Sequence, residues 1–94
     1  MILVLAKQKI KPENVDEFQK FAKIVVEEAN KEEGCVADYI VQSQDDPLIH
    51  VFVEIWKNQE ALDLHLKSEK LYELGLQLVP TIDGEQTAEK YNIL

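Results

Sequence analysis

The segment from Ile49 to Trp56 restricts the fold of this chain more than any other stretch of the sequence. It reads I-H-V-F-V-E-I-W, so its side chains alternate between two faces with the period of a β-strand. One face carries Ile49, Val51, Val53 and Ile55. The other face carries His50, Phe52, Glu54 and Trp56. The aliphatic face is typical of a core under helices, whereas the mixed face suits the lining of a cavity or a subunit interface.

The remaining hydrophobic patterns predict the element order βαββαβ. The expected elements are a strand over 2–10, a helix from Asn14 to Gly34, strands over 35–44 and 49–56, helices over 59–67 and from Ser68 to about Val79, and a last strand within 82–93. Two right-handed crossovers place the helices on one face of a four-stranded antiparallel sheet, which is the ferredoxin-like α+β fold. We expect the mixed face of 49–56 to be the uncovered one.

The length of 94 residues predicts a single domain spanning 1–94. Asn14 and Glu17 have the spacing of a capping box at the start of the first helix. Gly34 is the expected left-handed cap at its end. The sequence has no repeats or linkers that would divide it.

The composition excludes several classes of partner. The net charge is −8 and all ten basic residues are lysines, which argues against a nucleic-acid partner because phosphate binding needs clustered positive charge. Cys35 is the only cysteine, so neither a disulfide framework nor a cysteine metal site is expected. The apolar stretch over residues 1–7 is too short for a membrane span or a signal sequence. The default expectation is a soluble cytoplasmic protein without a membrane partner.

The segment from Val51 to Leu71 resembles the antibiotic biosynthesis monooxygenase (ABM) family. The family pattern is E-x-W, then an A-L pair, then H-x-x-S at a helix break, and here these residues are Glu54, Trp56, Ala61, Leu62, His65 and Ser68. The resemblance implies the family's complete βαββαβ module. It also implies a homodimer whose sheets pack face to face as a dimeric α/β barrel, which would cover the open face. Family members include cofactor-independent oxygenases of phenols and quinols, haem-degrading enzymes and a signal-molecule isomerase.

The haem-degrading branch of that family differs from this chain at its diagnostic positions. It places tryptophan where His65 stands and histidine where Gly75 stands. It also needs an asparagine on the first strand, near Ala6 or Lys7. The resemblance therefore does not extend to haem degradation.

His65 and Glu54 are the candidate catalytic residues. His65 lies on the inward side of a short helix, where it is either a base beside a cavity or a core histidine bonded to a backbone carbonyl. Glu54 either makes a structural hydrogen bond or accepts a phenolic proton as a carboxylate of raised pKa. The family resemblance favours the catalytic role of His65.

The candidate substrate-binding residues are mainly aromatic. They are Trp56, Phe52, Tyr72, His50 and Tyr39. These side chains either pack in the core or form a wall on which a planar substrate stacks. His50 and Glu54 lie roughly 13 Å apart along a strand, so they cannot chelate one metal ion. The sequence also has no glycine-rich phosphate loop, and we therefore expect no metal and no cofactor.

The resulting hypothesis is a cofactor-independent monooxygenase that oxidises a small aromatic, phenolic or quinol-like molecule with O2. A deprotonated phenol can reduce oxygen directly, so the protein has to supply a base and a dry pocket. The alternative is a non-oxygenase of the same fold, either an isomerase or a ligand-binding protein.

Overall fold

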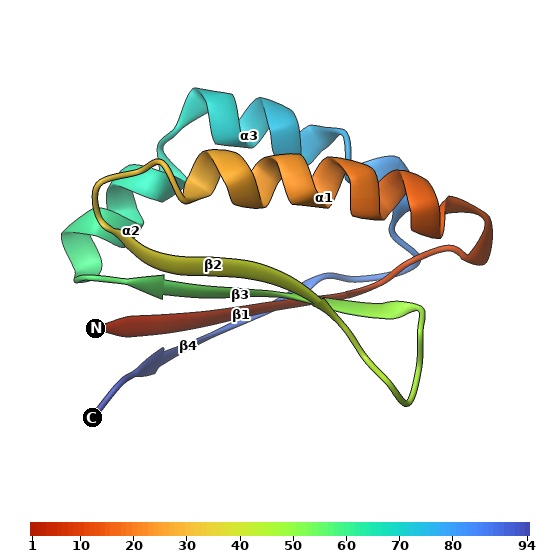
Figure 1. Ribbon diagram of the computed structural model, residues 1–94, viewed down its shortest axis with the longest axis horizontal. Coiled ribbons are helices and arrows are strands. Elements are labelled where there is room, and N and C mark those ends of the chain that lie inside the picture. Colours follow the sequence, from red (N-terminus) through yellow and green to blue (C-terminus); the bar gives the residue numbers. More distant parts are fainter.

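The computed structural model describes residues 1–94, in which helices cover one face of a four-stranded sheet (Figure 1). The elements are β1 (Ile2–Lys9), the 3-10 turn η1 (Pro12–Asn14), α1 (Val15–Ala29), β2 (Cys35–Gln42), β3 (Ile49–Trp56), α2 (Gln59–Leu66), α3 (Glu69–Leu76), η2 (Val79–Thr81) and β4 (Thr87–Asn92). The predicted order βαββαβ is confirmed, including the helix break at Ser68. None of the helices has the length and apolar character that crossing a bilayer requires.

The sheet has the strand order β2-β3-β1-β4, and every neighbouring pair is antiparallel. β3 therefore lies inside the sheet, between β1 and β2. The two ends of the chain meet at one end of the sheet, where Ile2 pairs with Asn92 (Figure 1). This topology confirms the ferredoxin-like α+β fold.

The two faces of β3 lie opposite to the predicted arrangement. His50, Phe52 and Trp56 are 1%, 6% and 0% exposed because they face the helices. Phe18 of α1 packs edge-on against His50 and Phe52, with ring centroids 5.0 and 6.2 Å apart. The aliphatic residues of β3 remain half-buried on the face without helices. The prediction that the mixed face is the uncovered one is wrong, because large rings are needed to fill the space between sheet and helices.

The buried apolar side chains form two clusters under the helices. The first consists of Ile10, Phe18, Ala22, Phe52 and Leu78. The second consists of Val4, Trp56 and Leu62. Members of both clusters line hollows between the sheet and the helices. The core therefore leaves space beneath the helices rather than filling it completely.

The first helix ends differently from the prediction. α1 stops at Ala29, and the side chain of Asn30 donates to the carbonyl oxygens of Val26 and Asp38 at 2.9 and 3.1 Å. Asn14 donates to the Glu17 carboxylate at 3.1 Å but caps no backbone N–H. Gly34 is not in the left-handed region, so the predicted glycine cap is wrong.

Gly34 is instead a point of close packing between the start of β2 and α2. A Cβ atom at this position would overlap the Cβ of Ala61. The N-terminal turn of α2 can therefore rest on the backbone here only because position 34 lacks a side chain. This contact sets the height of α2 above the sheet.

Gly34→Ala should lower the free energy of unfolding by roughly 1–3 kcal/mol through overpacking. The melting temperature should fall by roughly 5–20 °C, as measured by circular dichroism. Adding Ala61→Gly should restore most of the loss, although this change alone costs about 1 kcal/mol of helix propensity. Gly75→Ala is the matched control, because a Cβ there has no neighbour within 4 Å. A double variant no more stable than Gly34→Ala would contradict the packing role.

Candidate functional site

His65 lies on a helix whose start is capped by a side chain and whose end is followed directly by a second capped helix. The Asn58 side chain accepts a hydrogen bond from the Ala61 N–H at 2.9 Å and caps the start of α2. The Ser68 hydroxyl accepts from the Leu71 N–H at 3.3 Å and starts α3. The chain must therefore turn between the two helices, which leaves His65 in the last turn of α2.

The imidazole of His65 lies between two carboxylates. Its Nδ1 is 2.7 Å from Oε2 of Glu32, a hydrogen-bond distance. Its Nε2 is 3.8 Å from Oε1 of Glu54, which is too long for a hydrogen bond. The His65 side chain is 13% exposed. Glu32 therefore fixes the orientation of the ring, while Nε2 has no close partner on the protein.

The side chain of Trp56 contacts both Glu54 and His65. Its indole Nε1 donates to Oε1 of Glu54 at 2.9 Å. Its ring lies against the imidazole of His65, with centroids 4.4 Å apart and planes inclined at 34°. Trp56 is fully buried and lines neither adjoining hollow. Trp56 therefore positions Glu54 and His65, and it is not part of a cavity wall on which a substrate could stack.

His65 and Glu54 line a cavity of about 310 Å³ between the sheet, α3 and η2. Most of its lining is apolar: Ala6, Val25, Phe52, Gly75, Leu76, Leu78, Val79 and Ile82. Its polar residues are Asp38, Glu54, His65, Tyr72 and Gln86. A neighbouring hollow of about 340 Å³ shares His65 and Glu54 and extends along β4. An apolar cavity with a few converging polar groups is typical of a small-molecule site.

The structure brings together four of the residues predicted for the site. His65, Glu54 and Phe52 lie on the cavity wall. Tyr72 joins them from α3, where it is 67% exposed at the cavity rim. The sequence pattern thus located the part of the fold in which these side chains meet.

His50 and Tyr39 lie outside this cavity. His50 is buried against Phe18, and its Nδ1 lies 3.2 Å from the carbonyl oxygen of Leu48. Tyr39 pairs with Val53 on the face without helices and is 58% exposed. His50 lies on the same face of β3 as Phe52 and Glu54 but nearer the start of the strand, whereas strand alternation places Tyr39 on the opposite face of the sheet.

Three polar residues of the site were not predicted. They are Glu32, Asp38 and Gln86. Asp38 is 4% exposed, and its Oδ1 atom has no hydrogen-bond partner. A lone acid in the apolar strand C-V-A-D-Y-I-V-Q was the only signal for it. Glu32 and Gln86 lie in loops, where the sequence carries no periodicity that points to a site.

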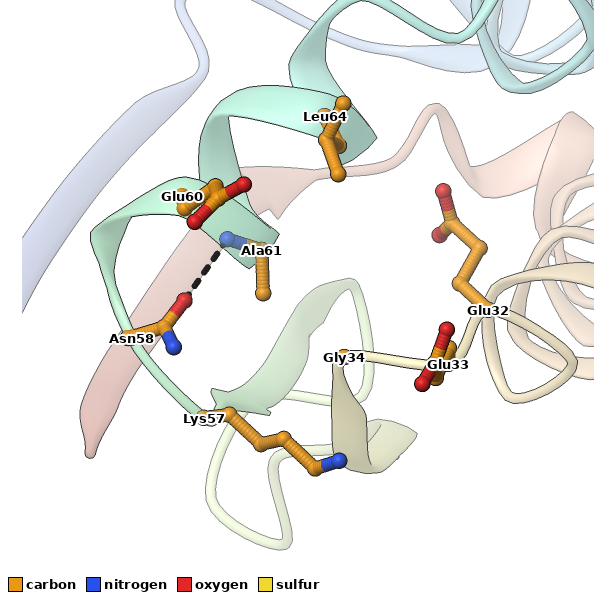
Figure 2. A pocket seen from close by; sticks show the side chains of 8 residues that line it. All are labelled: Glu32, Glu33, Gly34, Lys57, Asn58, Glu60, Ala61 and Leu64. Carbon is orange, nitrogen blue, oxygen red and sulfur yellow. Dashed lines mark hydrogen bonds between the residues drawn. The ribbon is translucent and has the colours of Figure 1, made fainter.

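A larger hollow of about 460 Å³ opens on the outer side of α2 (Figure 2). Its lining is mostly polar and consists of Glu32, Glu33, Gly34, Lys57, Asn58, Glu60, Ala61 and Leu64. Glu32 also bonds to His65, and its side chain is 26% exposed. Glu32 therefore connects the half-buried imidazole with this open hollow.

The same region offers no arrangement for a metal ion or a reactive thiolate. No group of three or more His, Cys, Asp or Glu side chains is placed to hold a metal. Burial and the nearby Asp38 raise the pKa of Cys35 to about 11. His65 and its neighbouring carboxylates are the groups in this region that can exchange protons with a ligand.

Comparisons with known proteins agree with this fold. A conserved protein from Methanosarcina mazei Go1 has a crystal structure with a TM-score of 0.91 at 37% identity, covering 96% of this chain and 89% of that chain. The structure of an antibiotic biosynthesis monooxygenase gives a TM-score of 0.92 at 29% identity, covering 100% of this chain and 99% of that chain.

One curated relative matches most of the chain. An uncharacterised protein of Synechocystis sp. is 28% identical over 72 residues, which make up 77% of this chain and 49% of the relative. The matched segment thus spans about half the length of that curated relative. The sequence pattern that defines antibiotic biosynthesis monooxygenases matches residues 1–73. This chain belongs to the antibiotic biosynthesis monooxygenase (ABM) family.

Proposed function

We propose that this protein is a cofactor-independent monooxygenase that uses O2 to oxidise a small phenolic or quinol-type molecule. The observation that carries the proposal is the position of His65 between Glu32 and Glu54 on the wall of an apolar cavity. The family's description and that of the structural relative at 29% identity support the same class of reaction.

The proposed base is Nε2 of His65. A carboxylate only accepts hydrogen bonds, so the short contact with Glu32 assigns the imidazole proton to Nδ1. The lone pair of the neutral ring is then on Nε2, which is free to accept the hydroxyl proton of a substrate. The imidazolium that forms lies between Glu32 and Glu54, whose negative charges stabilise it. Glu32 can accept the Nδ1 proton of this imidazolium and release it to solvent, because its side chain is partly exposed.

The deprotonated substrate supplies the electrons for the reaction. One electron passes from the aromatic anion to O2, and the two radicals combine to form a carbon–oxygen bond beside the deprotonated oxygen. The O–O bond then breaks and water leaves. For a quinol, the products are one hydroxyquinone and one water for each O2, with the four electrons coming from the ring. The apolar lining of the cavity protects these intermediates from solvent.

Oxygen uptake with benzene-1,4-diol as substrate tests the proposal. The protein should consume one O2 per quinol, and isotopically labelled O2 should place one labelled atom in the product and one in water. Heat-denatured protein corrects for autoxidation. Uptake no faster than this control would refute the oxygenase. A quinol that raises the melting temperature without being consumed would indicate the alternative, a binding protein or isomerase.

We also propose that the protein is a homodimer formed through the sheet face that no helix covers. This face carries the aliphatic side of β3, flanked by Leu3 and Leu5 of β1 and by Tyr39 and Val41 of β2. Tyr39 and Val41 are 58% and 45% exposed. A small domain gains stability by burying such a surface against a second copy.

A further inference from the structure

Asp38 is the polar group of the cavity whose position the structure leaves unexplained. It lies on β2 directly beside Glu54 of β3 and lines the cavity that contains His65. The side chain is 4% exposed, yet its Oδ1 atom has no hydrogen-bond partner. Buried polar atoms in folded proteins nearly always have a partner, because leaving one unpaired destabilises the fold. Because Asp38 lines the cavity, a ligand there would offer its carboxyl group a partner.

The surroundings determine the charge of this carboxyl group. Burial and the neighbouring carboxylates of Glu54 and Glu32 raise the pKa of Asp38 to about 8, so at neutral pH it carries a proton. A protonated carboxyl group both donates and accepts hydrogen bonds. No lysine lines this cavity, and the other ionisable lining groups are Glu54, His65 and Tyr72. An anionic ligand would therefore meet a carboxylate and no permanent positive charge.

We infer that Asp38 is a specificity-determining residue that binds a second oxygen of the substrate, remote from the hydroxyl presented to His65. The site would then select uncharged aromatic diols over monophenols and would reject aromatic carboxylates. This inference deepens the proposed function and rests on it, because it assigns the substrate class of the same cavity. Its binding step involves no oxygen chemistry, so it can be measured separately.

Binding measured without oxygen tests the inference. Benzene-1,4-diol, 4-methylphenol and 4-hydroxybenzoate are titrated into the full chain at neutral pH under anaerobic conditions, and NMR shifts give each Kd. The wild type should prefer the diol over 4-methylphenol by roughly 5–30-fold, the effect of one hydrogen bond to a buried partner. It should bind 4-hydroxybenzoate most weakly. Asp38→Leu should abolish the preference for the diol, whereas Asp38→Asn should retain it because an amide still donates and accepts.

Thermal melts show whether the variants are folded and test the charge state independently. Because its pKa is raised, Asp38 adds to stability below pH about 4 and loses that contribution as the pH rises through about 8. Asp38→Leu removes both the buried oxygen without a partner and this titration, so it should melt above the wild type by a margin that widens from about pH 4 to about pH 8. Asp45→Leu, in the exposed turn before β3, is the matched control. It should bind the three compounds like the wild type, and the difference between its melting temperature and that of the wild type should not depend on pH.

An unchanged preference for the diol in Asp38→Leu would overturn the inference. So would tighter binding of 4-hydroxybenzoate than of the diol, or failure of the wild type to bind any of the three compounds. If anaerobic selectivity is as expected but no oxygen is consumed in air, the proposed oxygenase fails while the role of Asp38 in binding stands.

Discussion

His65→Ala should lower quinol-dependent oxygen uptake by roughly 10²–10⁴-fold, the range that one acid–base group contributes. The variant keeps Glu32 and Glu54 but has no group that can take the hydroxyl proton at the same place. Because the His65 side chain is bounded by a cavity rather than packed on all sides, its loss should leave the fold in place. The measurement is kcat from oxygen uptake, together with the melting temperature of both proteins.

Glu32→Gln separates the base from the residue that positions it. A glutamine at this position can still accept a hydrogen bond from Nδ1 of His65 but no longer stabilises an imidazolium by charge. We expect a loss of kcat between those of the wild type and His65→Ala, with little change in KM.

The prediction for His65→Ala has a clear contradicting outcome. Normal turnover of this variant, combined with a loss of roughly 2–4 kcal/mol in the free energy of unfolding, would identify His65 as a core histidine.

Val53→Lys should weaken the proposed homodimer by roughly 10²–10⁴-fold. Val53 lies at the centre of the face without helices, with Leu5 on one neighbouring strand and Tyr39 on the other. In a monomer the lysine can extend into water, whereas in a face-to-face dimer its charge would be buried at a cost on the order of 3–5 kcal/mol. Light scattering should give about twice the 10.8 kDa chain mass for the wild type and the single chain mass for the variant.

Leu64→Lys is the control for this dimer prediction. Leu64 is 64% exposed on α2, away from the sheet face, so a lysine there should leave the dimer intact. Circular dichroism should show that both variants remain folded. A wild type that stays monomeric at micromolar concentration, or a Val53→Lys variant that still dimerises, would exclude this face as the interface.

The order and type of the elements could be read from local sequence patterns. Strand alternation over 49–56 and the helical stripes on either side of Ser68 each lie within one short segment. Such a pattern predicts the type of element whatever the rest of the fold is. The turn at Ser68 was predictable because a serine cap acts on its own helix start. For the same reason, His65 could be placed on the inward side of a helix next to the strand that carries Glu54.

The face of β3 that the helices cover depends on packing between distant segments of the chain. Both faces are apolar enough to be buried, so alternation could not choose between them, and the volume of Phe18, Phe52 and Trp56 under the helices made the choice. His50 also lies on the covered face but nearer the start of β3, and Tyr39 lies on the opposite face, so neither side chain lines the cavity.

The same limit explains the residues that the sequence did not reveal. Asp38 meets Glu54, and Glu32 meets His65, through contacts between segments that are 16 and 33 positions apart in the chain. Gly34 has its role because α2 lies directly on it, and no pattern around the glycine encodes the position of that helix. Periodicity describes how a segment is buried, whereas a site depends on which buried segments face one another, and packing alone settles this.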